Sequence, residues 1–477
     1  MSEKSRKTRS SHVNRAGGGG EGCGIVMYCC AVSVPRSRWP GTILLGGPPG
    51  PSYNQRGRPM SPLIFLVLLL LCLSGPLRSQ VPTRAAGIEA EREKKAAVLE
   101  PDEPTKAEQV LTRIKDDKIV ERIQAGYNGI RGKLGGLATG GGFALGPEYA
   151  REDLAGGKLH LRTAAAISFR NFQRYDLELK APETRTRPVF FQGYAVRHFY
   201  PSLQYYGQGP ESEKDGRSNF LYEDLAIDGT VGVAAGKGLR LAASGGYLKV
   251  HAGRGRDQRF ASIDENFGGG VTPGLDAQPD FARLGGYVEL DRTDNRFGPR
   301  GGTYLLANFN HLMDRGRGQY SFERLDLEGQ QYIPFFNQRR VIALRGRTNL
   351  TYTRDGRQVP FYLQPVLGGS DDLRGFRPFR FYGDQSMVMN AEYRWEVFSG
   401  LDMALFFDAG KVARRRADLD FSNLETAAGI GWRWNARNSV FLRMDVGFSH
   451  EGFQVWLKFN NIFAPKLIHS SSSQSVQ

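Results

Sequence analysis

The chain has 477 residues, and its 64 Lys and Arg against 49 Asp and Glu give a formal charge of +15. Its mean hydropathy of −0.41 excludes a membrane protein built from many apolar helices, because each crossing needs about 20 apolar residues. Aromatic residues make up 11% and glycines number 60, a composition typical of alternating strands and too aromatic for a disordered chain. The length allows two or three domains, or one large all-β domain.

The first segment of the chain is basic, glycine-rich and without periodicity. We interpret residues 1–59 as an overrun before the true start, or as disordered. An apolar run of eleven residues follows, from Leu63 to Leu73, which is too short to cross a bilayer as a helix. Its basic flank and the small residues after it predict a secretory signal peptide over 60–79. A single-pass anchor is the alternative.

The predicted leader carries most of the positive charge. Residues 1–79 contain all four cysteines and ten Lys or Arg against two Glu, so they account for +8 of the +15. An exported chain starting after residue 79 would have no cysteine and hence no disulfide framework. Because the basic excess lies mainly in the leader and no zinc-finger spacing is present, we expect no nucleic-acid partner.

Residues 80–125 are predicted to form a short helical arm. They are rich in Ala, Glu and Lys, and Thr105 is placed to begin a helix. We expect this arm to lie in the periplasm, where residues 86–124 could contact a partner. At the other end of the chain, residues 464–477 form a polar, serine-rich tail.

From residue 126 to 463 the apolar residues recur every second position. In 401–410, Leu401, Met403 and Leu405 share one face, whereas Asp402, Ala404, Phe406, Asp408 and Gly410 share the other. The same alternation runs through 389–397, 439–449 and 453–460. Eleven strands fit between 132 and 353 and five between 387 and 463, which gives about sixteen.

The connections between these strands predict a membrane barrel. Short turns near 182–188, 236–238 and 334–339 alternate with long loops such as 253–279 and 353–386, the asymmetry of an outer-membrane barrel. The polar face carries charges, among them Glu392, Arg394, Arg443 and Asp445, that a dry core would have to bury. The predicted fold class is therefore all-β, a transmembrane antiparallel barrel with a wet lumen.

A set of motifs late in the chain resembles a known family. Gly368-Gly369 precedes Leu373-Arg374-Gly375-Phe376, and Phe406-Phe407-Asp408-Ala409-Gly410 follows after Glu392-Tyr393-Arg394. This order resembles the barrel of the BamA/TamA family, the outer-membrane assembly-factor superfamily also called bacterial surface antigen. Upstream, residues 291–302 resemble a turn that the family carries before a mid-barrel strand. The resemblance covers residues 126–463 and implies an outer-membrane location in a Gram-negative bacterium, in contact with membrane lipid.

The resemblance implies roles for individual residues. It pairs Arg374, at the tip of a loop folded into the lumen, with Asp408 on the inner wall, and it makes Phe406 available to pack on that tip. Gly375 would allow a tight turn after the arginine. The end of the chain is similar to a barrel-assembly signal, carried by His450, Gly452, Val455, Leu457 and Phe463, with Phe463 ending the last strand.

The resemblance also implies a function, with alternatives left open. Relatives insert or export polypeptides, often with POTRA domains, for which residues 80–125 are too short. Nine glycines in 126–146 allow two interpretations. They predict a weakly pairing first strand, whose seam would open and template client strands such as those of unfolded barrel precursors. Alternatively, glycine only fits a crowded first hairpin. A passive channel or structural barrel, and a partner of a periplasmic machine, remain alternatives. We predict no enzyme activity, cofactor or metal site.

Overall fold

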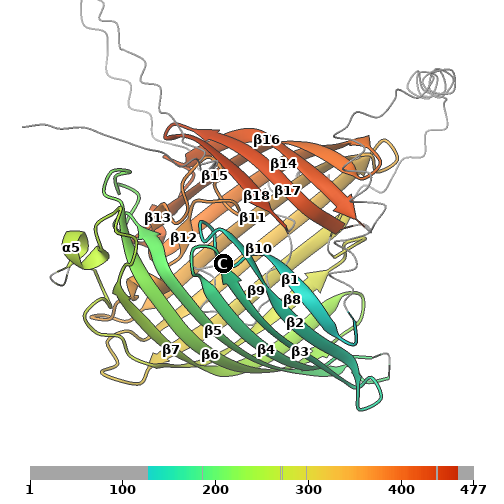
Figure 1. Ribbon diagram of the computed structural model, residues 1–477, viewed down its shortest axis with the longest axis horizontal. Coiled ribbons are helices and arrows are strands. Elements are labelled where there is room, and N and C mark those ends of the chain that lie inside the picture. The colour runs from blue at the N-terminus through green and yellow to red at the C-terminus, as the bar shows by residue number, and fades with distance from the viewer. Residues whose placement is uncertain are drawn as a thin grey trace, which may run out of the picture. The chain divides into compact units, whose positions relative to one another are not determined.

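The computed structural model describes residues 127–184, 186–268, 270, 272–296, 298–436, 439–459 and 463. The predicted overrun, signal peptide, helical arm and tail (1–59, 60–79, 80–125 and 464–477) therefore lie outside the described residues. The described part belongs to one compact unit that is made mainly of β-strands (Figure 1).

Sixteen strands form one antiparallel sheet whose order in space is the order in the chain. The first eleven are β1 (Ile130–Gly136), β2 (Phe143–Leu154), β3 (Leu159–Ser168), β4 (Gln173–Ala181), β5 (Val189–Tyr205), β6 (Ser218–Ala234), β7 (Leu239–Arg254), β8 (Phe281–Asp291), β9 (Gly302–Asp314), β10 (Phe322–Phe335) and β11 (Arg340–Thr353). The last five are β14 (Gln385–Phe398), β15 (Leu401–Ala413), β16 (Glu425–Ala436), β17 (Ser439–Ser449) and β18 (Gly452–Lys458). The predicted division into eleven and five strands is confirmed.

The remaining elements lie in the connections. The long connection from β7 to β8 contains α5 (Ile263–Phe267), and that from β15 to β16 contains η2 (Arg416–Asp418). The connection from β11 to β14 holds η1 (Phe361–Leu363) and a two-stranded sheet of β12 (Val366–Leu367) and β13 (Phe381–Tyr382). Among the described residues, no helix combines the length and the apolar character needed to cross a membrane.

The connections differ between the two ends of the barrel. At one end the connections have two to ten residues, for example 155–158, 235–238 and 399–400. The other end carries the long loops 255–280 and 354–384 together with a few tight turns. Because the strand number is even, β1 begins and β18 ends at the short-turn end, which is the periplasmic end in an outer-membrane barrel.

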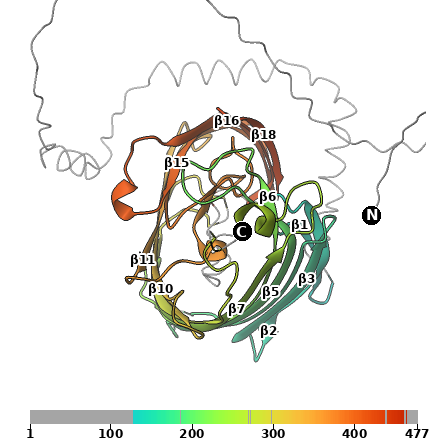
Figure 2. The same ribbon diagram turned by 90° about the vertical axis from the view of Figure 1, so that its left-hand side faces the viewer.

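The alternation places apolar side chains outside and polar ones inside. On β15, Leu405 and Phe407 are each 51% exposed, whereas Phe406 and Asp408, which alternate with them, are buried. The predicted faces of 389–397 are likewise observed, and so are those of 453–460 as far as Lys458, where β18 ends. Exposed apolar side chains therefore cover the outer wall (Figure 2 shows the strands curving around the interior), as a lipid-facing surface requires.

The sheet is not closed by hydrogen bonds between the described parts of β1 and β18, since each of these strands pairs on one side only. Side chains nevertheless meet across this seam. The ring of Phe143 on β2 lies 5.5 Å from that of Phe459, centroid to centroid. A Cβ at Gly135 on β1 would lie 4.0 Å from the Cβ of Phe459.

Candidate functional site

The loop 354–384 reaches the inner wall of the barrel near its last strands. Its residues Leu373 and Phe376 are fully buried, and they pack in a cluster with Leu367, Phe381, Val388, Val412 and Ala427. The rings of Phe376 and Phe381 meet edge to face at 5.3 Å. Apolar anchors on both sides of Arg374 thus fix the loop tip at one position in the lumen.

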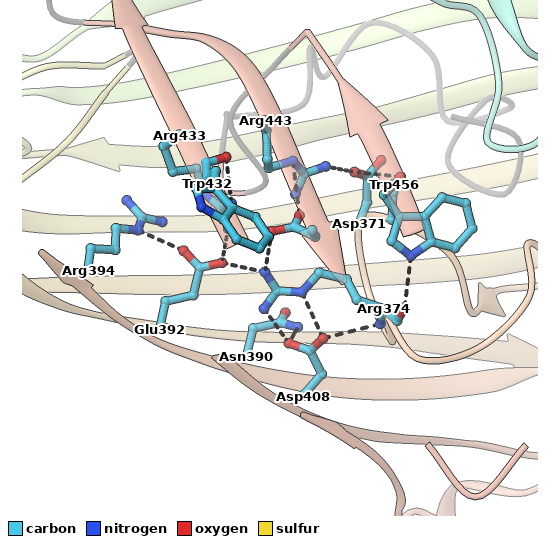
Figure 3. A network of polar contacts seen from close by, with 12 residues as sticks. Asp371, Arg374, Asn390, Glu392, Arg394, Asp408, Trp432, Arg433, Arg443 and Trp456 are labelled. Atoms are coloured by element: carbon cyan, nitrogen blue, oxygen red, sulfur yellow. Dashed lines mark hydrogen bonds and ion pairs between the residues drawn. The ribbon is translucent and has the colours of Figure 1, made fainter. Parts of the chain in front are cut away.

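Arg374 binds Asp408 through two parallel hydrogen bonds. Its Nε donates to Oδ2 at 2.8 Å and its Nη2 donates to Oδ1 at 2.7 Å, while its backbone N–H also donates to Oδ2 at 3.2 Å. Asn390 donates to Oδ1 of the same carboxylate at 2.8 Å. The structure therefore brings together the loop arginine and the wall aspartate as a bidentate pair, the strongest geometry for this ion pair (Figure 3).

A second carboxylate holds the other side of the guanidinium. Nη1 of Arg374 donates to Glu392 on β14. Glu392 also accepts hydrogen bonds from Arg433 at 2.8 Å and from Arg394 at 2.7 Å. One glutamate is thus shared by three arginines, which links the loop tip to β14 and β16.

Asp445 and Asp371 extend this network. Arg433 donates to Asp445 on β17 at 2.6 Å, and Arg443 donates to Asp371 in the loop at 3.1 Å. Four arginines therefore face four carboxylates: Arg374, Arg394, Arg433 and Arg443 against Asp371, Glu392, Asp408 and Asp445. We call these eight residues the lumenal ion network.

The lumenal ion network corrects the expectation of a wet lumen. Arg374, Asp408 and Asp445 are 0% exposed, because the loop covers the wall there. Asp371 and Asp372 are also paired, since Arg443 donates to Asp371 and Arg347 donates to Asp372 at 2.5 Å. Burial opposes the charge on Arg374, but the carboxylates of Asp408 and Glu392 outweigh it and hold the pKa of the guanidinium above its usual value.

Phe406 lies beneath the arginine, as the predicted inward direction allows. The Cζ atom of Arg374 lies 3.5 Å from the centre of its ring, which adds a cation–π contact to the ion pairs. Gly429 on β16 makes this position possible, because a Cβ there would lie 2.4 Å from the tip of the Phe406 ring. Gly410, the last residue of its motif, lies against β14, where a Cβ would meet the Met387 carbonyl oxygen at 2.7 Å.

Gly375 has a different role from the one predicted. Its φ lies outside the left-handed region, so a special turn is not the reason for glycine. A Cβ on Gly375 would instead meet the carbonyl carbon and oxygen of Phe448 at 2.7 Å. A Cβ on Gly447 would meet the carbonyl oxygen of Arg374 at 2.5 Å. Because Gly375 in the loop and Gly447 on β17 both lack a side chain, the backbone of the loop can contact the backbone of β17.

The loop tip is also bound to β18. Trp456 donates from its indole N–H to the carbonyl oxygen of Arg374 at 2.8 Å, and Ser449 donates to that of Gly375 at 2.8 Å. Asp445 was among the charges expected to point inward, but Arg433 and Trp456 were not singled out from the sequence. Their inward direction on glycine-rich alternating strands is the one signal that pointed to them.

The residues of the predicted assembly signal do not form one cluster. His450 and Gly452 lie at the β17–β18 turn, where the His450 ring is 5.3 Å from that of Phe376. Val455 and Leu457 are exposed on the outer face. Phe463 does not end the last strand, because β18 ends at Lys458. It is buried beside Tyr332, Val341 and Ala343, so its ring packs against the inner wall.

Within the described residues, no group of three or more His, Cys, Asp and Glu is gathered that could hold a metal ion. His198 and Asp224 form a buried pair with an Nδ1–Oδ1 distance of 2.6 Å. The lumenal ion network, by contrast, is a site of ion pairs that fixes the loop 354–384 against β14, β15, β16, β17 and β18.

The family model of the Omp85 superfamily domain matches residues 182–451. This chain belongs to the Omp85 superfamily. The match spans β5 to the β17–β18 turn, and so includes the loop 354–384, Arg374 and Asp408. The resemblance to the BamA/TamA family is therefore confirmed at the level of the superfamily.

One solved structure supports the fold, and two others are similar at lower TM-scores. BamA from Haemophilus ducreyi lacking POTRA domains 1–3 is similar with a TM-score of 0.52 at 15% identity, over 70% of this chain and 69% of that chain. CdiB from Escherichia coli matches with a TM-score of 0.47 at 12% identity, over 70% and 62% of the two chains. CdiB from Acinetobacter baumannii matches with a TM-score of 0.41 at 12% identity, over 69% and 57%. This chain thus spans less than two thirds of each CdiB chain.

Proposed function

We propose that this Omp85 barrel lies in the outer membrane of a Gram-negative bacterium and assists the insertion or translocation of polypeptides there. The observation that carries the proposal is the seam. The described parts of β1 and β18 share no backbone ladder, and the free edge of a short strand is a template for another strand. Membership of the superfamily supports the same activity.

The lumenal ion network supports this role by fixing one side of the seam. The loop tip binds β18 through Trp456 and touches β17 through Gly375. β1 is held separately, because Lys133 donates to Asp176 on β4 at 2.9 Å. Two independent anchors on the two sides would let the edges separate while the rest of the wall keeps its shape.

A folding assay tests the proposal directly. The full chain is placed in phospholipid vesicles, and an unfolded eight-stranded barrel is added from outside. We expect the client to acquire the heat-modifiable gel migration of a folded barrel faster than in empty vesicles. In cells, depletion of the chain should lower the amounts of other outer-membrane barrels. Unchanged client folding together with unchanged barrel amounts would contradict the proposal.

A passive channel is the second candidate, and the polar inner wall favours it. It predicts open-pore conductance in a planar bilayer when the loop 354–384 is removed, with no change in other barrels. The third alternative, a partner docked on residues 86–124, concerns a segment outside the described residues. It predicts that deletion of 86–124 abolishes function while the barrel still assembles.

A further inference from the structure

The charge of the connections differs between the two ends of the barrel. The seven turns at the short-turn end, 155–158, 182–188, 235–238, 292–301, 336–339, 399–400 and 437–438, carry nine Lys or Arg and two acidic residues. The connections at the other end carry fifteen basic and fifteen acidic residues. The positive charge that remains outside the predicted leader is therefore concentrated at the periplasmic end.

Some cations at this end already have partners. Arg300 donates to both carboxylate oxygens of Asp402, at 2.8 and 2.7 Å, and Arg240 is paired with Glu183 and Glu289. Others are exposed and form no ion pair with any described residue: Lys158, Lys237, Arg292, Arg339 and Arg340. These five lie on, or at the edge of, four different turns around the rim, so they face the surroundings of the barrel.

Arg339 and Arg340 lie next to a group of aromatic rings. The Cζ atom of Arg340 is 4.8 Å from the centre of the Phe336 ring, and Arg340 is opposite Trp395 on β14 in the strand register. The Tyr393 ring stacks on that of Trp395 at 5.6 Å. Aromatic side chains gather where a barrel wall meets the lipid headgroups, which places Arg340 at headgroup depth.

The direction of Arg340 identifies the side on which a ligand would lie. It shares a face of β11 with Ile342 and Leu344, which are 38% and 42% exposed on the outer wall. A guanidinium on this face meets lipid and not the lumen. Because a guanidinium binds phosphate oxygens with two parallel donors, the chemistry suits a phosphodiester headgroup.

We propose that the periplasmic rim, centred on Arg339 and Arg340, binds anionic phospholipid headgroups of the periplasmic leaflet. Cations spread over four turns match a charged leaflet that surrounds the barrel better than they match a compact partner at one point. Basic residues close to an anionic leaflet are attracted to it electrostatically. This inference is independent of the proposed role in polypeptide insertion.

The test is a lipid titration of the purified full chain in detergent, read by native mass spectrometry. Phosphatidylglycerol is compared with phosphatidylcholine of the same acyl chains. The test variant is Arg339→Gln/Arg340→Gln. The matched control is Arg315→Gln/Arg317→Gln, which removes two exposed arginines from the β9–β10 loop at the opposite end. Arg339→Lys/Arg340→Lys keeps the charge, and heat-modifiable migration verifies that each variant is folded.

We expect the wild-type chain and the control to prefer phosphatidylglycerol, and the glutamine variant to bind it about thirtyfold more weakly. The lysine variant should keep most of the preference. Equal binding of both lipids by the wild-type chain would overturn the proposal, as would equal losses in the test and control variants. The glutamine variant could instead keep the lipid preference but no longer bind an acidic periplasmic protein. That result would make the rim a protein-binding site and would also overturn the proposal.

Discussion

The indole N–H of Trp456 on β18 donates a hydrogen bond of 2.8 Å to the carbonyl oxygen of Arg374. This bond joins the tip of the lumenal loop to the strand that borders the seam. The same arginine holds Asp408 on β15 and Glu392 on β14. One residue thus connects the interior wall to the edge at which a client strand would pair.

Substitution of Arg374 or Asp408 by alanine should destabilise the barrel by similar amounts. Removing one partner leaves the other charge buried, which costs about 3–5 kcal/mol. The double variant should cost little more than either single one. The stability of the two single variants and of the double variant is measured by urea-dependent unfolding in micelles, with gel migration as the readout. Simple additivity of the two single losses would contradict the pairing.

Arg374→Lys should not restore the wild-type stability. Lysine has one ammonium group and cannot donate in parallel to Asp408 while also reaching Glu392. Its unfolding midpoint should therefore lie closer to that of Arg374→Ala than to that of the wild-type chain. The same urea titration measures this. A lysine variant as stable as the wild-type chain would show that charge alone, and not the forked geometry, holds the loop.

Gly375→Ala should loosen the loop tip from β17. The added Cβ would lie 2.7 Å from the backbone of Phe448, and overpacking of this kind costs about 1–3 kcal/mol. Gly346→Ala is the matched control, because its Cβ meets nothing within 4 Å and it also lies outside the left-handed region. Limited proteolysis of the folded barrel should cleave the loop 354–384 faster in Gly375→Ala alone. Equal cleavage of both variants would contradict the close approach.

Trp456→Phe should weaken the link between loop and seam while the ring is kept. It leaves the buried carbonyl of Arg374 without its donor, at a cost of about 1–3 kcal/mol. Hydrogen exchange of β18 measures the effect, with Trp395→Phe as the control on the outer wall. Unaltered exchange of β18 in Trp456→Phe would mean that the loop does not hold this strand.

Phe463→Ala should lower the stability of the barrel refolded in vitro. Removal of the buried ring would leave a cavity beside Tyr332 and Val341, and truncation of a buried Phe to Ala lowers the free energy of unfolding by about 3–5 kcal/mol. Phe453→Ala is the control, since Phe453 is 54% exposed on the outer wall. Unchanged stability in vitro with poor assembly in cells would instead assign Phe463 to an assembly signal.

Local patterns predicted most of the wall. The two-residue period on β15 gave the inward direction of Phe406 and Asp408, because neighbouring side chains in a strand must alternate. Strand lengths and turns predicted sixteen strands with short turns at one end. The bidentate partner of Arg374 followed from the resemblance to a family and not from spacing.

Contacts that depend on tertiary approach were not predictable from the sequence. Gly375 was assigned to a turn, yet its neighbour in space is β17 and the constraint is contact with Phe448. Asp445 and Trp456 meet the loop tip from strands more than 70 residues away in the chain. Burial of the lumenal charges followed from the path of the loop, which alternation of the strands does not reveal.

Locking the seam tests the central claim most directly. Phe143 and Phe459 touch across it, so Phe143→Cys/Phe459→Cys can be bridged by a short bismaleimide. Leu145→Cys/Ile167→Cys is the control, because these outward residues pair within the continuous wall between β2 and β3. We predict that bridging the seam stops folding of the added client barrel, whereas the control bridge does not. A seam-locked chain that still speeds client folding would contradict the account.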